Sequence, residues 1–335
     1  MHWARLPALL LGAACEARPE TLQQFGGATM GSSYEVKFVS NQPIATVRAL
    51  VEEELAAFDQ TFSNWRDDSE IAQVNRHASP TPLPVSARFA AVLQLALDVA
   101  VMTEGAFDPT VKPLSDAYRA AKIDPEHRLP VAVLAAAKAR VGHQLVSLRE
   151  GAVVKRRADV ELDLDGLVAG AACDAIAQRL LAIGVTSFYL QITGEVLCRG
   201  EKGHGVPWRI GVADPNSDAQ GGDEAIRTLS LRDQALCTSG DYRNAFVADG
   251  VIAHHVFDPR TGSWANNGIA SVSVLATTAA VADALGTAFL VLGENDSKRL
   301  WPSLQRLGAK GVLFLLPTAD EQIRQVEITW PKDNS

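Results

Sequence analysis

Two oxygen-bearing side chains stand out because they lie four positions apart in an otherwise apolar segment. Asp283 and Thr287 fall within residues 278–292, where alanine, valine and leucine predominate. In a helix, side chains four positions apart lie on one face. A carboxylate and a hydroxyl on one face form half of a site for a hard cation such as Mg²⁺, which accepts water or phosphate oxygens at its remaining positions. Taken alone, such a pair is more often solvated or a helix cap than a metal site.

Residues 251–257 alternate in the manner of a strand and carry two histidines. Alternation places His255 on one face and His254 on the other, so only one of them can face a given site. Histidine can act as a general base near neutral pH. The strand ends at an Asp-Pro turn, after which Arg260 offers a guanidinium. A lone strand histidine is more often packed or solvated than catalytic, so this segment needs support from elsewhere.

Two further segments are typical of turns that approach phosphate. Residues 237–243 place small hydroxyl side chains and a glycine after a strand, followed by an aromatic residue and a cation. Backbone N–H groups in such turns can contact phosphate closely. Residues 26–32 are also glycine-rich, but they precede a strand, whereas the dinucleotide-binding fingerprint opens a helix. Neither segment is specific in isolation.

Hydrophobic periodicity predicts the elements that must position these residues. Alternating apolar residues predict strands, and apolar residues at helical spacing predict amphipathic helices. Strands and helices mix without strict alternation, which favours an α+β fold over a doubly wound sheet. We therefore expect a single large mixed domain with antiparallel-rich sheets and packed helices. The expected helices cover residues 43–60, 86–103, 131–140, 168–183, 278–292 and 296–306, a hairpin covers 144–156, and the other strands cover 33–39, 187–193, 208–213, 226–231, 251–257, 269–276, 311–316 and 323–329.

Composition excludes several classes of protein. Of the 335 residues, 47% are hydrophobic and 21% are charged, which is close to an average globular protein and sufficient for a large core. The formal net charge is −8, and the basic run at residues 155–157 is too short to reverse the overall field. We expect no nucleic-acid partner.

The N-terminus resembles a bacterial export signal. His2 and Arg5 precede the short apolar stretch 6–11, and small residues then lead to Cys15. In a lipoprotein signal this cysteine becomes the lipidated first residue of the mature chain, although Gly12 stands where such signals usually carry an aliphatic residue. The apolar stretch is too short to span a bilayer, which needs about 20 residues.

These features divide the chain into three parts. We expect residues 1–14 to be a signal peptide, residues 15–24 to be a tether and residues 25–331 to form the folded domain. The protein is then expected at the bacterial cell envelope, on the periplasmic side, anchored to a membrane by lipid at Cys15. Three further cysteines cannot all pair with one another, so we expect no disulfide framework.

Seven segments form a collinear set between about residue 25 and residue 293. They are residues 25–34 (FGGATMGSSY), 67–71 (DDSEI) with Asn75, 103–111 (TEGAFDPTV), 163–166 (DLDG) continuing to Asp174, 238–243 (TSGDYR), 255–262 (HVFDPRTG) and 282–287 (ADALGT). In this order they resemble the FAD:protein FMN transferase family, also called the ApbE family of thiamine-biosynthesis lipoproteins. Seven segments in order are far more specific than any one of them.

The resemblance implies a reaction and a metal. Members of this family bind FAD, cleave its pyrophosphate with Mg²⁺, and join FMN by a phosphoester to a Ser or Thr of a membrane-associated redox protein, releasing AMP. In the family, the metal is held by the Asp and Thr of the last segment and by a backbone carbonyl of the Asp-x-x-Gly segment. These positions correspond to Asp283, Thr287 and the region of Val168.

The resemblance also implies a base and a flavin pocket. His255 matches the family histidine before the Asp-Pro turn and would take the proton of the acceptor hydroxyl. The pocket would use aromatic side chains that stack on rings, small polar residues, and a carboxylate that accepts from a hydroxyl or an amine. The matching residues are Met30, Trp65, Phe107, Asp174, Thr238 and Gly240.

Two departures from the family pattern keep other functions open. Ala169 stands where many relatives carry a Lys, with Ala171 where an aromatic residue is frequent, and loss of the cation would weaken nucleotide binding. Thr193 and Gly194 replace the usual pair of glycines, which gives the backbone less freedom. The alternatives are a flavin-binding accessory protein for assembly of a respiratory reductase and an Mg²⁺-dependent FAD pyrophosphatase.

Overall fold

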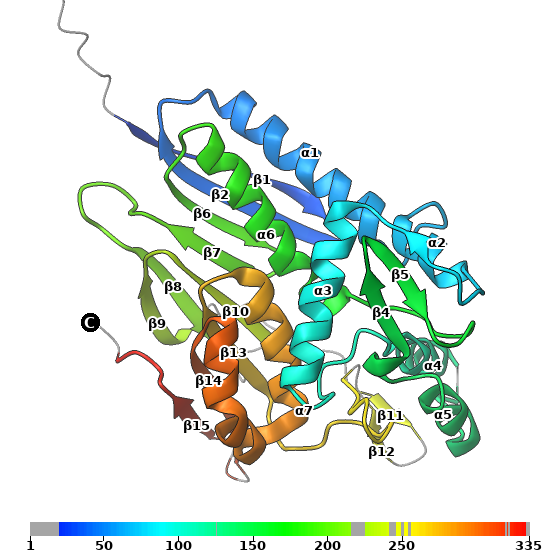
Figure 1. Cartoon of the computed structure of the whole chain (residues 1–335). Helices are drawn as coiled ribbons and strands as arrows, with labels where there is room; N and C mark the ends of the chain where they lie inside the picture. The colour runs from blue at the N-terminus through cyan, green and yellow to red at the C-terminus, as the bar shows by residue number, and fades with distance from the viewer. Residues whose placement is uncertain are drawn as a thin grey trace, which may run out of the picture.

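An eight-stranded antiparallel sheet forms the centre of the molecule (Figure 1). The computed structural model describes residues 20–124, 126–215, 225–240, 246–248, 251–253, 256–318, 320 and 322–332. The strand order is β1-β2-β6-β7-β10-β13-β14-β15, and each neighbouring pair runs antiparallel. These strands are β1 (Thr21–Thr29), β2 (Ser32–Ser40), β6 (Ser187–Ile192), β7 (Glu195–Arg199), β10 (Gln234–Gly240), β13 (Ser271–Ala276), β14 (Ala309–Pro317) and β15 (Ile323–Ile328).

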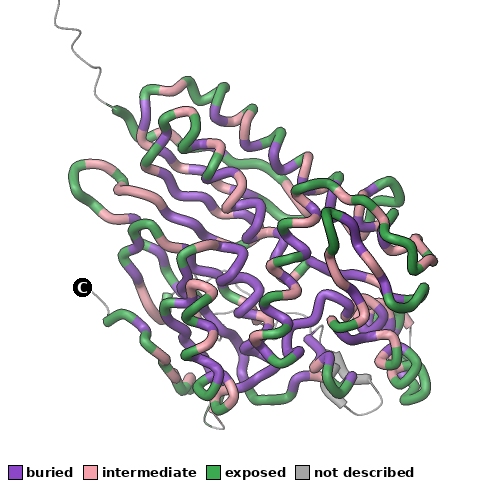
Figure 2. The backbone as a smooth tube through the Cα atoms, in the orientation of Figure 1, coloured by how far each residue is buried: buried purple, intermediate pink, exposed green. Residues whose placement is uncertain are grey.

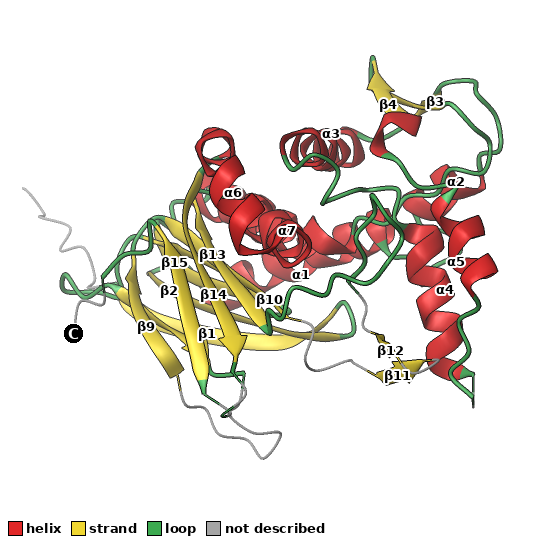
Figure 3. Ribbon diagram, turned by 90° about the horizontal axis from the view of Figure 1, so that it is seen from below, coloured by secondary structure: helices red, strands yellow, loops and turns green. Residues whose placement is uncertain are grey.

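Helices cover one face of this sheet (Figures 1 and 3). They are α1 (Ile44–Phe62), α3 (Ala87–Met102), α6 (Asp165–Ala182) and α7 (Ala279–Leu304). Helix α6 packs against α1 and α7, and α7 packs on β10 and β13. Their apolar faces meet the sheet in one large core that includes Phe38, Phe58, Leu180, Phe188, Val272 and Phe289. The amphipathic pattern of the sequence is therefore used to bury helix faces against the sheet.

A second, smaller core lies on the other face of the sheet. The hairpin of β8 (Trp208–Ala213) and β9 (Ala225–Leu231) contributes Trp208, Ile210, Val212, Leu229 and Leu231, which pack on sheet residues such as Leu313 and Leu315. The central strands are thus buried on both sides, as the purple backbone in Figure 2 shows. Cys173, Cys198 and Cys237 are buried free thiols.

Smaller elements lie outside the central sheet and the four helices that cover it. They are α2 (Glu70–Arg76), α4 (Lys112–Ile123), α5 (Val131–Lys138), the strands β3 (Leu83–Pro84), β4 (Val146–Arg149), β5 (Ala152–Lys155), β11 (Phe246–Ala248) and β12 (Val251–Ala253), and two 3₁₀ turns at His143–Leu145 and Gln305–Leu307. In the described residues, no helix is both long and apolar enough to cross a bilayer.

The α+β fold expected from the sequence is confirmed, and several elements agree closely. In β2, Tyr34, Val36 and Phe38 are buried and alternate with partly exposed residues. Helix α3 begins where expected because the Ser86 hydroxyl accepts the N–H of Phe89 at 3.1 Å.

Other elements differ from expectation. The two helices expected at 278–292 and 296–306 form one element, α7, broken at Gly293, which has φ 72°. The strand expected at 251–257 ends at Ala253, and Phe257 instead forms an isolated bridge with Trp264. Strand β1 starts at Thr21, inside the expected tether, and its mostly exposed, glycine-containing sequence lacks the alternation that would have revealed it. Strands β7 and β10 and helices α2 and α4 were not predicted.

Candidate active site

A pocket of about 720 Å³ opens where α6 and α7 meet the ends of β6, β7 and β10. This volume is within the range of small-molecule sites. The loop after α3, helix α4 and the segment 256–259 complete its walls. Its lining includes Phe107, Asp108, Tyr118, Arg119, Asp163, Asp165, Gly166, Thr193, Gly194, Glu195, Thr238, Gly240, Phe257, Asp283 and Thr287.

Asp283 and Thr287 both line this pocket from α7. The carboxylate of Asp283 is 6% exposed, and its Oδ2 accepts the backbone N–H of Gly170 at 3.0 Å. Burial raises the pKa of Asp283 to about 7, although the hydrogen bond from Gly170 opposes the shift. Thr287 faces the first turn of α6, because a Cβ on Gly166 would lie 3.2 Å from its Oγ1. The one-face arrangement expected from the sequence thus places two oxygen donors at the same wall.

These donors fit a hard cation that keeps part of its own coordination shell. Among the described residues, no group of three or more His, Cys, Asp or Glu side chains is arranged to hold a metal ion. Asp283 would be the charged ligand and Thr287 a neutral one. Val168, the third expected ligand, is buried in α6 and is not among the residues that line the pocket, so its carbonyl stays a proposed ligand. Mg²⁺ accepts such a sparse set when water and phosphate supply the other oxygens.

Asp174 lies outside the pocket lining and contacts the start of α7. Its two carboxylate oxygens accept the backbone N–H groups of Ala279 and Ala280, each at 2.9 Å. These are unpaired donors of the first turn of α7, so Asp174 caps that helix from α6. Burial raises its pKa to about 6, and the two hydrogen bonds oppose the shift. These two hydrogen bonds fix α7 on α6, and the expected hydrogen bond between Asp174 and the flavin nucleotide stays a prediction.

Phe107, Thr238 and Gly240, which the family resemblance assigns to the flavin pocket, lie in the lining of this pocket. The Oγ1 of Thr238 is 2.7 Å from Oγ of Ser273 on the neighbouring strand. The loop that carries Phe107 is fixed because its N–H donates to Oγ1 of Thr103 at 3.2 Å. The next residue, Asp108, accepts the N–H and hydroxyl of Thr110 at 2.8 and 2.6 Å.

Glu195 is a pocket residue that the sequence did not single out as functional. Its Oε2 is buried and has no hydrogen-bond partner within the described part of the chain. Burial, and then the charge of Asp283, raise the pKa of Glu195 well above its usual range. It follows the turn of Thr193 and Gly194, whose φ values of 55° and 117° are both left-handed. The non-glycine residue of this turn therefore accepts a conformation that glycine adopts more easily.

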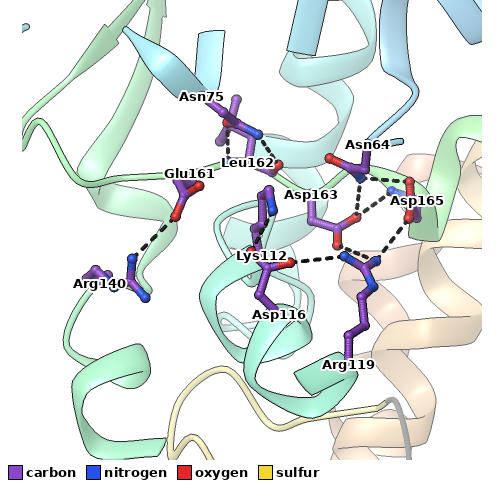
Figure 4. Close-up of polar contacts among 10 residues, drawn as sticks. All are labelled: Asn64, Asn75, Lys112, Asp116, Arg119, Arg140, Glu161, Leu162, Asp163 and Asp165. Atoms are coloured by element: carbon purple, nitrogen blue, oxygen red, sulfur yellow. Dashed lines mark hydrogen bonds and ion pairs between the residues drawn. The ribbon is translucent and has the colours of Figure 1, made fainter. Parts of the chain in front are cut away.

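A cluster of charged side chains forms another wall of the pocket (Figure 4). Asn64 donates from Nδ2 to Asp163 at 3.3 Å and to Asp165 at 3.0 Å. The guanidinium of Arg119, on α4, lies 3.6 Å from Oδ2 of Asp163 and 3.5 Å from Oδ2 of Asp165. The segment before these carboxylates is held by Asn75, which exchanges hydrogen bonds with the backbone of Leu162 at 2.7 and 2.9 Å.

Two predicted flavin contacts lie outside the pocket lining. Trp65 is 81% exposed, and its ring lies 5.3 Å from the guanidinium carbon of Arg119. Met30 occupies the β1–β2 turn with φ 48°, where it packs partly against the main core. Both residues were matched to the family by sequence position, which does not show where the turn or the ring lies in space.

His255 and Cys15 are outside the described residues, so the structure does not place them. The residues that follow the histidine, Val256, Phe257 and Pro259, line the pocket. Ala169 is a partly buried residue of α6 that packs against the main core and does not line the pocket.

Known proteins with similar sequences point to the same family as the seven segments. The ApbE family model matches residues 30–309. A curated FAD:protein FMN transferase of Vibrio cholerae is 34% identical over 87% of this chain and 87% of its own length. The protein of the same name from Haemophilus influenzae is 31% identical over 85% of this chain and 84% of its own.

Solved structures show the same architecture. The flavin transferase ApbE from Vibrio cholerae superimposes with a TM-score of 0.80 at 29% identity, covering 92% of this chain and 97% of that one. The apo form of the Pseudomonas stutzeri flavinyl transferase ApbE gives a TM-score of 0.80 at 29% identity, covering 92% and 95%. With a family match over most of its length, a shared fold and a pocket built from the family's segments, this chain belongs to the ApbE family.

Proposed function

We propose that the protein is an Mg²⁺-dependent FAD:protein FMN transferase that joins FMN to a Ser or Thr hydroxyl of an acceptor protein and releases AMP. The observation that carries the proposal is the buried carboxylate of Asp283, which lines a 720 Å³ pocket together with Thr287. The curated relatives named FAD:protein FMN transferase support the same reaction.

Asp283, Thr287 and the carbonyl of Val168 would hold Mg²⁺. Bound there, Mg²⁺ would offset negative charge that develops on the phosphoryl oxygens during transfer. The chain itself prepares the site, because Gly170 engages one oxygen of Asp283 and leaves the other for a cation. Asp174 contributes indirectly by fixing the first turn of α7, from which Asp283 projects.

The reaction is a phosphoryl substitution. The acceptor hydroxyl oxygen attacks the phosphorus of the FMN half of FAD, and a new P–O bond forms. The bond from that phosphorus to the bridging oxygen breaks, and AMP leaves with the bonding electrons. His255 would take the proton from the attacking hydroxyl, because the histidine before the Asp-Pro turn is the family's candidate base.

The remaining assigned residues would bind FAD. Phe107 offers an aromatic face, and Thr238 and Gly240 offer polar and backbone groups at the end of β10. Met30 and Trp65 stay proposed contacts for the part of FAD that extends beyond the pocket.

We also propose where the protein acts. Lipid at Cys15 would hold it on the periplasmic side of the cell envelope. Its acceptor would be a membrane-associated redox protein, and no nucleic acid would be involved.

One incubation tests the reaction against both alternatives. Purified protein is mixed with FAD, Mg²⁺ and an acceptor redox protein prepared without its covalent flavin, and then the acceptor mass and the free nucleotides are measured. A transferase gives AMP and an acceptor heavier by one FMN. AMP with free FMN and an unchanged acceptor would identify a pyrophosphatase, whereas intact FAD would identify a binding protein, and either result would refute the proposal.

A further inference from the structure

The charges around the pocket are unbalanced for a nucleotide. Five of the described lining residues carry carboxyl groups, namely Asp108, Asp163, Asp165, Glu195 and Asp283, whereas Arg119 is the one cation that the described lining contains. Burial raises the pKa of Asp165, Glu195 and Asp283, and none of the five can offset the charge of a phosphate. A dinucleotide brings a negatively charged pyrophosphate into this space. Repulsion between charges is strong where water is partly excluded, so cations must accompany the phosphates. Mg²⁺ at Asp283 would be one source of positive charge, and Arg119 is the protein's own source.

The guanidinium of Arg119 is held in place without being saturated. Its Nη1 donates a hydrogen bond to Oδ1 of Asp116 at 3.1 Å. Its Nη2 lies 3.6 and 3.5 Å from Asp163 and Asp165, distances longer than ordinary N–H···O hydrogen bonds. A guanidinium carries five N–H donors, and only one hydrogen bond of Arg119 is formed within the described part of the chain. Donors therefore remain for an additional anion.

Trp65 supports the same side chain from another direction. Its ring lies 5.3 Å from the guanidinium carbon, within the range of a cation–π contact. The residue is 81% exposed, so the ring covers Arg119 from the solvent side and is not part of the core. A guanidinium fixed by a ring and by carboxylates is well suited to bind phosphate oxygens in a defined direction.

We propose that Arg119 binds a phosphate group of the dinucleotide and that Trp65 positions Arg119. Arg119 would then supply the cation that the sequence lacks at Ala169, from a different helix. This inference rests on the proposed function, because it assumes that the pocket holds FAD.

The test measures binding and not turnover. FAD affinity is determined from quenching of flavin fluorescence in buffer with EDTA, for the wild type, Arg119→Gln and Arg119→Lys. Arg119→Gln should weaken FAD binding about 10- to 100-fold, the usual worth of a charge-assisted hydrogen bond pair. Arg119→Lys keeps the charge and should recover part of this loss.

Arg140→Gln is the matched control. Arg140 is also an ion-paired arginine in this region, 3.3 Å from Oε2 of Glu161, but it does not line the pocket (Figure 4). Its replacement should change FAD affinity by less than about twofold, because partly exposed ion pairs contribute little. Trp65→Ala should weaken FAD binding less than Arg119→Gln does. Its effect should be smaller in the Arg119→Gln protein than in the wild type, because only a direct contact of the Trp65 ring with FAD can then still be lost.

Three results would overturn the inference. FAD affinity that is equal in Arg119→Gln and Arg140→Gln would show that no phosphate depends on Arg119. An equally large loss for Arg119→Lys and Arg119→Gln would indicate a role in shape and not in charge. If Arg119→Gln weakened the binding of riboflavin, which has no phosphate, as much as it weakens the binding of FAD, a role in shape and not in charge would again be indicated. A wild type that binds FAD but transfers no FMN would refute the proposed function and leave this test valid.

Discussion

The backbone N–H of Gly170 donates a hydrogen bond to Oδ2 of Asp283 at 3.0 Å, which joins helices α6 and α7 at the carboxylate proposed to bind Mg²⁺. The two helices touch closely here, because a Cβ on Gly170 would lie 2.4 Å from the carbonyl oxygen of Ala279. Asp174 adds a second link by accepting the N–H groups of Ala279 and Ala280. The carboxylate of Asp283 is therefore oriented by the Gly170 hydrogen bond, on a helix whose start is fixed by Asp174.

Replacing Asp283 should separate turnover from FAD binding. Asp283→Ala removes the charged ligand, and loss of electrostatic stabilisation in phosphoryl transfer is worth about 3–4 kcal/mol, or about 100- to 1000-fold in rate. FAD affinity should fall much less, because ring stacking does not depend on the cation. AMP release is measured as a function of Mg²⁺ concentration. Asp283→Asn, which can still accept from Gly170, controls for loss of the helix contact, and an Asn variant with the wild-type rate would place the cation elsewhere.

Thr287→Val should have a milder effect than Asp283→Ala. Valine is nearly the same shape, and water can replace a neutral oxygen ligand of Mg²⁺. We expect a higher Mg²⁺ requirement and a rate loss of about 10-fold, less than for the loss of a charged ligand. The dependence of AMP release on Mg²⁺ measures both quantities. A loss as large as that of Asp283→Ala would indicate that the hydroxyl does more than occupy one coordination position.

Gly166→Ala should impair activity through crowding. A Cβ at this position would lie 3.2 Å from Oγ1 of Thr287 and 3.3 Å from Cε2 of Phe107. Either side chain must then move by a few tenths of an ångström, and small displacements of catalytic groups cost about 10-fold or more in rate. The melting temperature of the Gly166→Ala protein should equal that of the wild type. If the cause is contact with Thr287, the added effect of Gly166→Ala should shrink in a Thr287→Ala background, and an undiminished effect would implicate Phe107 instead.

The sequence predicted what depends on local periodicity. Asp283 and Thr287 were placed on one helical face because helical spacing is fixed by backbone geometry, and the strand faces of β2 followed from simple alternation. Contacts between distant segments could not be read in this way. Asp174 was assigned to the nucleotide because nothing in the sequence shows that α7 begins beside it.

Arg119 and Trp65 illustrate the same limit at the pocket wall. Each lies in a segment with its own local pattern, and only the packing of α4 beside the turn after α1 brings the ring and the guanidinium together. The sequence shows that Ala169 stands where many relatives carry a cation. It does not show that Arg119, on α4, lines the pocket. A carboxylate-rich pocket with one described cation becomes apparent only when its lining is known.

Replacing Cys15 tests the proposed anchor. Cys15→Ser should release the protein into the soluble periplasmic fraction, because the acyl chains of a lipoprotein contribute about 0.8 kcal/mol per buried CH₂. Fractionation of cells followed by immunoblotting measures the distribution. A variant that stays on the membrane, or a wild type found in the cytoplasm, would contradict the assignment of residues 1–14 as a lipoprotein signal peptide.

The contribution of Asp174 to the free energy of unfolding should fall as the pH rises from about 4 to about 6. Burial raises the pKa of its carboxyl to about 6 in the folded chain, from an ordinary value of 3.8. The folded protein therefore holds this proton more tightly than the unfolded chain does. Its contribution to stability is fully present below the unfolded pKa and is lost as the pH rises through the folded one.

The measurement compares the wild type with Asp174→Asn, which does not titrate. Unfolding free energies are determined by urea denaturation at several pH values in buffer with EDTA, so that changes from other carboxyl groups cancel in the difference. Asparagine can accept only one of the two N–H groups of α7, so the variant should be less stable at pH 4.5. The advantage of the wild type should then narrow by up to about 2 kcal/mol between pH 4.5 and pH 7, since each pKa unit is worth about 1.4 kcal/mol and part of the whole effect is already lost at pH 4.5. If the advantage instead widens with pH, attraction between the ionised carboxylate and the N-terminus of α7 exceeds the cost of burial, and the pKa of Asp174 is lowered and not raised.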